Sequence, residues 1–284
     1  MKHIGSLRIG SACIAVRVSP AAAADVLRAH LEEFFVQEDP RALLDIHFVP
    51  GPAIEVPAGP DGTVRFTLLD GLAWGWSDPE GRTTSLCALE GLLAPHAIRA
   101  FAHLLIPSFY AAHYDGDELR GVLLHASAVE VVPGAAGVFL AASQGGKSTV
   151  AEIARATHPV LHEEVVVLTE SADGTFAAGV GPWPGLRTSG VGLRLPVRGL
   201  FLIEKADGHA LFESDGAEAH GRVLAQIVFA QDFHDRSPHD VLENMARFCE
   251  RLCARVTPDV LRFRPDAGFL ELVESRVRTR RDTA

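Results

Sequence analysis

The chain has 284 residues, of which 48% are hydrophobic and 22% are charged. This balance is typical of a folded globular protein, and the length suits one large domain or two modest ones. The formal net charge of −10 argues against binding to nucleic acid through a basic face. Only the segment 276–281 is locally basic, and its simplest interpretation is a solvated end of the chain.

The sequence favours a cytoplasmic protein that does not cross a membrane. Four cysteines in a chain of this length do not make a disulfide framework, and they lack the spacing of a metal site. Arg8 and Arg17 interrupt the apolar core that a signal peptide needs. The most apolar long stretch, 122–142, contains His125, Glu130 and a Pro-Gly turn, so two strands are predicted there instead of a membrane span.

Residues 1–115 are predicted to form a small α+β domain. An apolar run over 8–18 predicts a first strand, and apolar side chains at helical spacing predict a helix over 20–36. A second helix is predicted over 87–105. Strand-like runs bounded by glycine or proline turns lie at 44–49, 63–69 and 72–76.

Residues 116–284 are predicted to form a second domain, and the turn-forming run Asp115-Gly116-Asp117 marks the boundary. Apolar runs and helical periodicity alternate there, as expected of an α/β domain. Strands are predicted at 121–132, 137–142, 160–169 and 200–204, and helices at about 148–156 and from 237.

The strongest chemical signal is the run Ala141-Ala142-Ser143-Gln144-Gly145-Gly146-Lys147-Ser148-Thr149. Small residues let consecutive backbone N–H groups turn toward phosphates, and the helix that follows points its positive end at the same anion. Such a P-loop is expected to place Lys147 on the β- and γ-phosphates of ATP and the hydroxyl of Ser148 on Mg²⁺. The predicted nucleotide-binding residues are Ser143, Gln144, Gly145, Gly146, Lys147, Ser148 and Thr149.

One position departs from the P-loop pattern, because Ala141 stands where the pattern has its first glycine. A methyl group is tolerated at Ala141 if its φ is negative and clashes if φ is positive. The alternative interpretation is a glycine-rich turn between a strand and a helix, with an incidental lysine.

Two further features are candidates for chemistry. Glu163 and Glu164 follow Lys147 by 16 and 17 residues and stand at the edge of an apolar strand. Carboxylates there suit a site that needs Mg²⁺ and a general base, although adjacent strand residues point to opposite faces. His125 lies in an apolar strand. Taken alone, the acids are more simply a polar strand start, and His125 is more simply a hydrogen-bonded core residue.

Together these segments resemble HPr kinase/phosphorylase and its shorter HPr-kinase-like relatives. The resemblance covers about residues 118–275, and its motifs have the order and spacing of that family. They are Leu124–Val129, Gly146–Thr149, Leu161–Val165 and Leu195–Glu204.

The resemblance implies a fold class and an activity. The fold is α/β: a P-loop kinase domain like the C-terminal domain of HPr kinase, related to phosphoenolpyruvate carboxykinase, preceded by the small α+β domain. The activity is that of a serine kinase that uses ATP and Mg²⁺. Of the family's two acids, one is the base for the acceptor hydroxyl and the other places the metal. They fall on Glu163 and Glu164, with Ser148 and Glu164 as metal ligands. The family histidine falls on His125, which lines the nucleotide site.

Two departures from the family leave an alternative open. The acidic pair is Asp-Asp in the family, and the segment that binds the HPr substrate is missing here. The expected acceptor is therefore a hydroxyl on a peptide, a small protein or a small molecule. The alternative, which Ala141 and the replacement of both aspartates by Glu163 and Glu164 favour, is a catalytically degenerate module that binds a nucleotide or a partner. Assembly into a homo-oligomer stays open.

Overall fold

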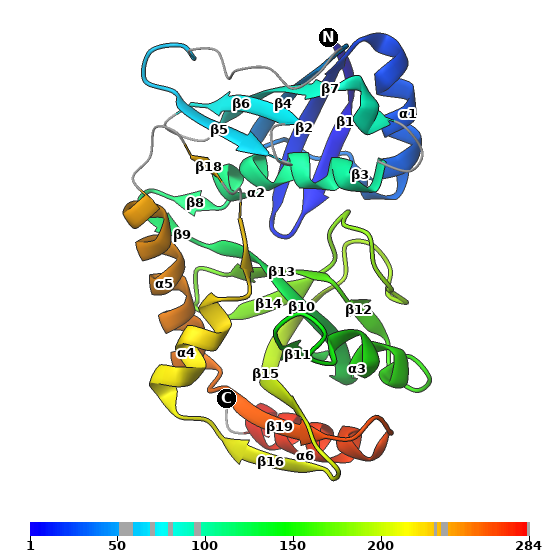
Figure 1. Cartoon of the computed structure of the whole chain (residues 1–284), viewed down its shortest axis with the longest axis vertical. Helices are drawn as coiled ribbons and strands as arrows, with labels where there is room; N and C mark the ends of the chain where they lie inside the picture. Colours follow the sequence, from blue (N-terminus) through cyan, green and yellow to red (C-terminus); the bar gives the residue numbers. More distant parts are fainter. Residues whose placement is uncertain are drawn as a thin grey trace. The chain divides into compact units, whose positions relative to one another are not determined.

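The computed structural model describes residues 1–50, 59–68, 72–78, 82–93, 98–229, 232–233 and 238–282. The chain is a mixed α/β protein of two units (Figure 1). Unit 1 comprises Met1–Leu119, Pro182–Pro184 and Phe229–Glu243. Unit 2 comprises Arg120–Gly181, Gly185–Val228 and Asn244–Ala284. Two segments from beyond residue 116 thus belong to the first unit, which the sequence did not predict.

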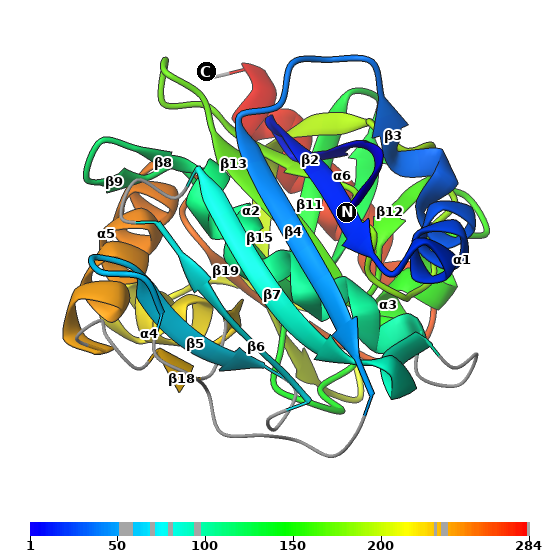
Figure 2. The ribbon, with the colours of Figure 1, turned by 90° about the horizontal axis from the view of Figure 1, so that it is seen from above.

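Unit 1 contains a sheet with the strand order β18-β5-β6-β7-β4-β2-β1-β3. Helices α1 (Ala21–Leu31) and α2 (Ile106–Ala112) pack against it. Strands β2, β4 and β7 run parallel to one another through its centre (Figure 2). The strands are β1 (Lys2–Ile9), β2 (Ala12–Ser19), β3 (Phe35–Val36), β4 (Ala42–Val49), β5 (Val64–Leu68), β6 (Ala73–Ser77), β7 (Thr83–Leu89) and β18 (Asp232–Phe233).

The structure corrects three predictions in this unit. The single strand over 8–18 is wrong, because the chain reverses at Gly10, whose φ of 64° favours glycine, and β1 pairs with β2 as a hairpin. The helix over 20–36 ends at Leu31 and is followed by a 3₁₀ turn, η1 (Glu32–Phe34). The helix over 87–105 is wrong at its start, which belongs to β7. The 3₁₀ segments η2 (Glu90–Leu93) and η3 (Ile98–Leu105) follow, and residues 94–97 lie outside the described residues.

The main sheet of unit 2 closes on itself. Strand β15 pairs with β14 on one side and with β11 on the other, so β11, β10, β13, β14 and β15 form a ring, and β19 and β16 extend it. Strands β11, β15 and β19 are parallel, so their carboxyl ends meet at one edge. The strands are β10 (Gly121–Val132), β11 (Ala135–Leu140), β12 (Val160–His162), β13 (Val165–Glu170), β14 (Phe176–Gly179), β15 (Arg194–Lys205), β16 (Ala210–Glu213), β17 (Ile227–Val228) and β19 (Asp259–Phe263).

Four helices accompany this sheet: α3 (Lys147–Ala154), α4 (Gly216–Leu224), α5 (Pro238–Arg255) and α6 (Gly268–Asp282). The strands predicted near 121–132, 137–142 and 200–204 and the helix near 148–156 are confirmed, with shifted ends. The continuous strand over 160–169 is wrong, because Glu163 and Glu164 form a break between β12 and β13. A short hairpin of β8 (Tyr114–Asp115) and β9 (Glu118–Leu119) precedes β10.

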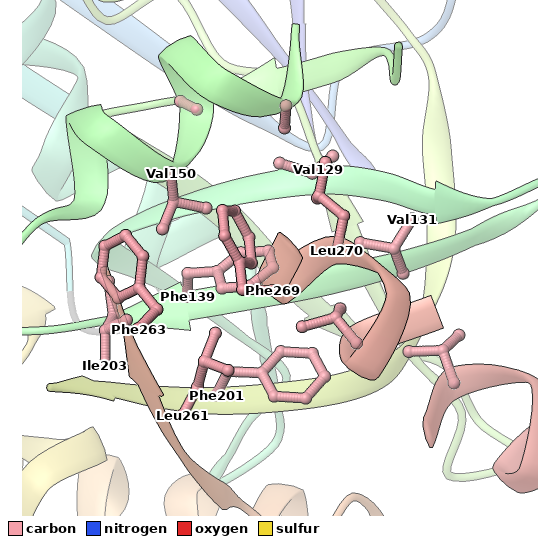
Figure 3. Close-up of a cluster of buried hydrophobic side chains, with 14 of the residues drawn as sticks. Val129, Val131, Phe139, Val150, Phe201, Ile203, Leu261, Phe263, Phe269 and Leu270 are labelled. Carbon is pink, nitrogen blue, oxygen red and sulfur yellow. The ribbon is translucent and has the colours of Figure 1, made fainter. Parts of the chain in front are cut away.

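A core of buried side chains joins the parallel strands to α3 and α6 (Figure 3). Phe139 of β11 stacks on Phe201 of β15 with ring centroids 5.1 Å apart, and Phe269 of α6 meets Phe139 edge to face. Val150 of α3 is fully buried in the same cluster. Aromatic pairs of this kind add about 0.5–1.5 kcal/mol beyond the area that they bury. The strand and the helix on either side of the loop 141–146 are therefore held by one packed core.

Within the described part of the chain, no helix combines the length and the apolar character that a membrane crossing requires.

Candidate functional site

The loop 141–146 connects β11 to α3 and has the backbone shape of an anion cradle. Gln144 has a φ of 62° and Gly146 a φ of 110°, and Gly146 is the N-cap of α3. The amide N–H of Gly145 donates a hydrogen bond of 2.9 Å to the carbonyl of Ala142. Left-handed residues in such a turn direct successive amides into its concave side, toward the N-terminus of the helix.

The two glycines of the loop are required by close packing. A Cβ on Gly145 would lie 2.5 Å from the Cβ of Ala141, and one on Gly146 would lie 3.1 Å from Cζ of Phe263. Among described residues other than glycine, only Gln144 has a positive φ. Ala141 therefore keeps an ordinary backbone, and its methyl group is accommodated because position 145 has no side chain.

Lys147, the first residue of α3, turns its side chain back over the loop. Its ammonium donates hydrogen bonds to the carbonyl oxygens of Ala141 at 2.8 Å and Ala142 at 3.2 Å, and the residue is only 5% exposed. Burial lowers the pKa of Lys147, and the charge of Glu164 opposes this effect. An ammonium has three N–H donors, so the positive charge is held at the mouth of the cradle with further capacity to bind an anion.

His125 and Glu164 form a pair beside this lysine. Nε2 of His125 lies 3.2 Å from Oε1 of Glu164, and the two side chains are 32% and 49% exposed. Burial lowers the pKa of His125, and the charge of Lys147 lowers it further, while Glu164 raises it. The net shift is downward, so His125 is neutral at neutral pH. His125, Lys147 and Glu164 thus form one electrostatic group, assembled from β10, α3 and the turn before β13.

That turn is held by a residue whose role the sequence did not predict. His162 is fully buried, and its Nδ1 accepts hydrogen bonds from the amides of Glu164 at 3.1 Å and Val165 at 3.0 Å. Gly185 packs against it, because a Cβ there would lie 2.8 Å from Cε1 of His162 and 3.3 Å from Cβ of Glu164. His162 therefore positions the Glu164 backbone. The sequence feature that could have revealed this role is the position of His162 directly before Glu163 and Glu164.

The remaining predicted residues lie on the loop, in the first turn of α3 and, for Glu163, in the turn between β12 and β13. Ser143, Gln144 and Ser148 are exposed, while Gly145, Thr149 and Glu163 are half-buried. Glu163 makes no hydrogen bond or ion pair with another residue in the described ranges. Of the two acids, the structure brings only Glu164 to His125 and Lys147.

A hollow of about 670 Å³ opens beside the loop, at the carboxyl ends of β11 and β15. Ligands of α/β proteins commonly bind at this edge of a sheet. Lys205 ends β15 and stands near the loop, with its Cε 4.0 Å from the position that a Cβ on Gly146 would take. Arg222 of α4 contributes a guanidinium, which pairs with Glu204 at 3.1 Å. The residues lining the hollow are Leu140, Ala141, Ala142, Gln144, Gly145, Leu202, Ile203, Glu204, Lys205, Arg222, Ala225 and Gln226.

No group of three or more His, Cys, Asp or Glu side chains is arranged to hold a metal ion among the residues that the structure describes. Mg²⁺ that binds together with nucleotide phosphates needs only one or two protein ligands, because phosphate oxygens and waters supply the others. The hydroxyl of Ser148 and the carboxylate of Glu164 are oxygen donors of the kind that this ion takes.

A comparison of the chain with models of protein families finds no match, and a comparison with curated proteins finds none either.

Proposed function

We propose that this protein is an ATP-dependent phosphotransferase of the HPr-kinase-like type, which transfers the γ-phosphoryl group to a hydroxyl. The observation that carries the proposal is the position of Lys147. Its buried ammonium lies at the start of a helix, over a loop with left-handed residues at 144 and 146, and within electrostatic reach of the His125–Glu164 pair. A phosphoryl-transfer site needs these parts: a cradle of amides, a cation and a carboxylate.

Each residue has a separate task in this proposal. The loop amides and the ammonium of Lys147, released from the carbonyls of Ala141 and Ala142, bind the phosphate oxygens. Mg²⁺, bound by Ser148 and Glu164, would neutralise charge on the phosphates. Glu163 is the proposed base, which takes the proton of the acceptor hydroxyl. Catalysis then consists mainly of positioning and electrostatic stabilisation.

The hollow beside Lys205 is the proposed place of the nucleoside. The acceptor hydroxyl must lie within hydrogen-bonding reach of the carboxylates at 163–164, and therefore on the side of the loop where β10 and β13 lie. The hollow extends toward β15 and α4 and borders β10 at Gln226, whose carbonyl accepts a hydrogen bond of 2.8 Å from the amide of His125. Apolar Leu140 and Leu202 line that hollow, and Gln226 and Arg222 supply polar groups for the base or the ribose.

One observation favours a second candidate, a module that binds the nucleotide without turnover. Glu163 has no described partner that orients it, whereas Glu164 is held by His125. A general base that is misplaced by about 1 Å can cost on the order of a hundredfold in rate. Longer acids at these two positions, compared with the Asp-Asp pair of the family, are compatible with a site that retains binding but has lost catalysis.

Nucleotide binding is tested by thermal unfolding with and without Mg-ATP. At one hundred times its dissociation constant, a ligand that binds only the folded state stabilises it by about 2.7 kcal/mol. For a protein of this size that corresponds to a rise of about 5–10 °C in Tm. Lys147→Ala should remove most of the rise. Lys2→Ala is the matched control, because that exposed lysine pairs with Asp25 in unit 1. No rise in wild-type Tm at millimolar Mg-ATP would refute nucleotide binding.

Turnover is tested by following transfer of phosphate from ATP to peptide, protein and small-molecule hydroxyls. Glu163→Gln should lower the rate and leave the affinity for Mg-ATP nearly unchanged, because a base acts mainly in the transition state. Glu164→Gln should weaken Mg-ATP binding as well, because it removes a metal ligand. If wild type binds Mg-ATP but neither it nor a Glu163→Asp, Glu164→Asp double variant transfers phosphate, the binding module replaces the kinase.

A further inference from the structure

A second hollow in unit 2 gathers positive charge far from the loop 141–146. It has a volume of about 280 Å³, and three arginines line it, Arg198, Arg255 and Arg280. The hydroxyl-bearing Thr175 and Thr257 also line it, and the other lining side chains are apolar. Among the described residues that line it there is no carboxylate, in a chain whose net charge is −10.

The hollow lies at the opposite end of β15 from the proposed nucleotide site. Arg198 precedes Lys205 by seven residues along this strand, a span of about 23 Å at the usual rise of a strand. Arg255 ends α5, just before β19, and Thr175 precedes β14. One ligand of ordinary size therefore does not occupy both places.

The fold holds Arg280 in position. A Cβ on Gly199 would lie 2.9 Å from Cγ2 of Val277, so α6 packs closely over β15 at this point. On the same helix, Arg276 donates a hydrogen bond of 2.9 Å to Oδ1 of fully buried Asp259, and Arg280 forms an ion pair of 3.0 Å with Oδ2 of that carboxylate. Arg280 is thus anchored through its partner and is only 22% exposed, which reduces the entropy that ligand binding would cost.

Arg198 and Arg255 are not neutralised in this way. Neither makes an ion pair with another residue in the described ranges. The charge of Arg255 contributes to the lowered pKa of Asp173, whose main cause is the hydrogen bond that its carboxylate accepts from the amide of Thr175. Like charges gathered around one hollow repel one another unless an anion lies between them. Guanidinium groups match the oxygens of phosphate with paired hydrogen bonds, and threonine hydroxyls add donors.

We propose that this arginine-lined hollow is a second anion site, which binds the phosphate group of a small phosphorylated ligand independently of the loop 141–146. Its volume admits a phosphate group and the first atoms of the molecule attached to it, but not a folded partner. The basic segment 276–281 is then part of a binding site and not only a solvated end of the chain, because Arg280 lines the hollow.

The test uses the full chain with Lys147→Ala, which weakens phosphate binding at the loop, and titrates it with inorganic phosphate by calorimetry. Saturable binding is expected, and Arg198→Gln or Arg255→Gln should weaken it about tenfold or more, the usual cost of one charged hydrogen bond. Arg278→Gln is the matched control, because Arg278 lies on α6, is 64% exposed and pairs with Glu274. It removes the same charge and should leave binding unchanged.

Three results would overturn the site. The first is phosphate binding that is unchanged in both Gln variants, and the second is an equal loss of binding in the Arg278→Gln control. The third is an equal binding signal when sodium chloride at matched ionic strength is titrated in place of phosphate. Arg198→Lys covers the case in which Arg198→Gln does not fold. It keeps the charge without the guanidinium fork, so weaker phosphate binding than that of the Lys147→Ala parent supports the site, and parent-like binding removes Arg198 from it. A parallel titration with glycerol 3-phosphate distinguishes the source, since tighter binding than that of inorganic phosphate identifies a phosphate ester.

Discussion

Replacement of Gly145 by alanine tests how the loop 141–146 is packed. The new Cβ would lie 2.5 Å from the Cβ of Ala141 and 2.9 Å from the carbonyl oxygen of Ala142. Unbonded carbon atoms pack at about 3.5–4.0 Å, so the loop or the end of β11 must move by about 1 Å. Overpacking of this kind costs about 1–3 kcal/mol. Since about 2–4 °C corresponds to 1 kcal/mol for a protein of this size, Tm should fall by about 2–12 °C.

The clash with Ala141 makes the prediction specific. Ala141→Gly removes the nearer of the two atoms, so the double variant Ala141→Gly, Gly145→Ala should regain part of the lost stability. Urea unfolding of wild type, both single variants and the double variant closes a thermodynamic cycle, in which we expect a coupling energy of at least about 0.5 kcal/mol. Recovery is incomplete because the contact with the Ala142 carbonyl remains.

Two results would refute this reasoning. The first is a Gly145→Ala protein that melts within about 1 °C of wild type, which would mean that the loop is loose enough to absorb a methyl group. The second is strict additivity of the two substitutions, which would mean that the side chain of Ala141 is not the neighbour that excludes a Cβ from position 145. Added Mg-ATP then distinguishes loop shape from stability, because the displaced amides of Gly145→Ala should reduce the ligand-induced rise in Tm.

Three further perturbations follow from the geometry of unit 2. Gln144→Gly should raise the free energy of unfolding in urea by about 1 kcal/mol, because a left-handed backbone costs a residue with a Cβ about 1–2 kcal/mol. Phe201→Ala should lower it by about 3–5 kcal/mol, because the residue is fully buried against Phe139. Stability should decline as pH falls below about 6.5, because the lowered pKa of His125 lets the unfolded chain take up a proton before the folded one. His125→Asn should remove that part of the decline, measured by urea unfolding at pH 7.5 and 5.5.

Each of these three predictions would be contradicted by a specific result. Gln144→Ala, which keeps a Cβ, is the control for Gln144→Gly, and equal stability of the two would mean that the backbone strain is absent. Phe212→Ala, at a side chain that is 47% exposed, is the control for Phe201→Ala and should cost much less. For His125, an unchanged pH slope in the Asn variant would assign the decline to other groups.

The sequence by itself determined the local features of the candidate site. A short apolar strand, a run of small residues and a helix that begins at a lysine follow from composition and spacing, because strand, turn and helix tendencies act over a few residues. The strand that carries His125 and the loop 141–146 were predictable for this reason. The need for glycine at positions 145 and 146 could be predicted as well. The atoms that exclude a Cβ from each position could not.

Only the tertiary structure decided which of these segments meet. The pairing of β10 with β13 places His125 opposite Val165, and the hydrogen bonds of buried His162 turn Glu164 toward it. The apolar residues at both ends of 160–169 give no sign of that break, because the interaction that causes it satisfies backbone amides with a side chain. The hairpin at Gly10 escaped prediction for a similar reason, since a two-residue turn hardly interrupts an apolar run.

The two hollows depend on contacts that are remote in sequence. Lys205 reaches the loop 141–146 only because β15 pairs in parallel with β11, and Arg280 reaches Arg198 only because Gly199 lets α6 approach the same strand. Strand order and helix docking are set by how the whole apolar surface is buried, and no local pattern specifies them. Local propensity therefore determined which strand, loop or helix carries each chemical group. Long-range packing determined which of these groups lie together in one site.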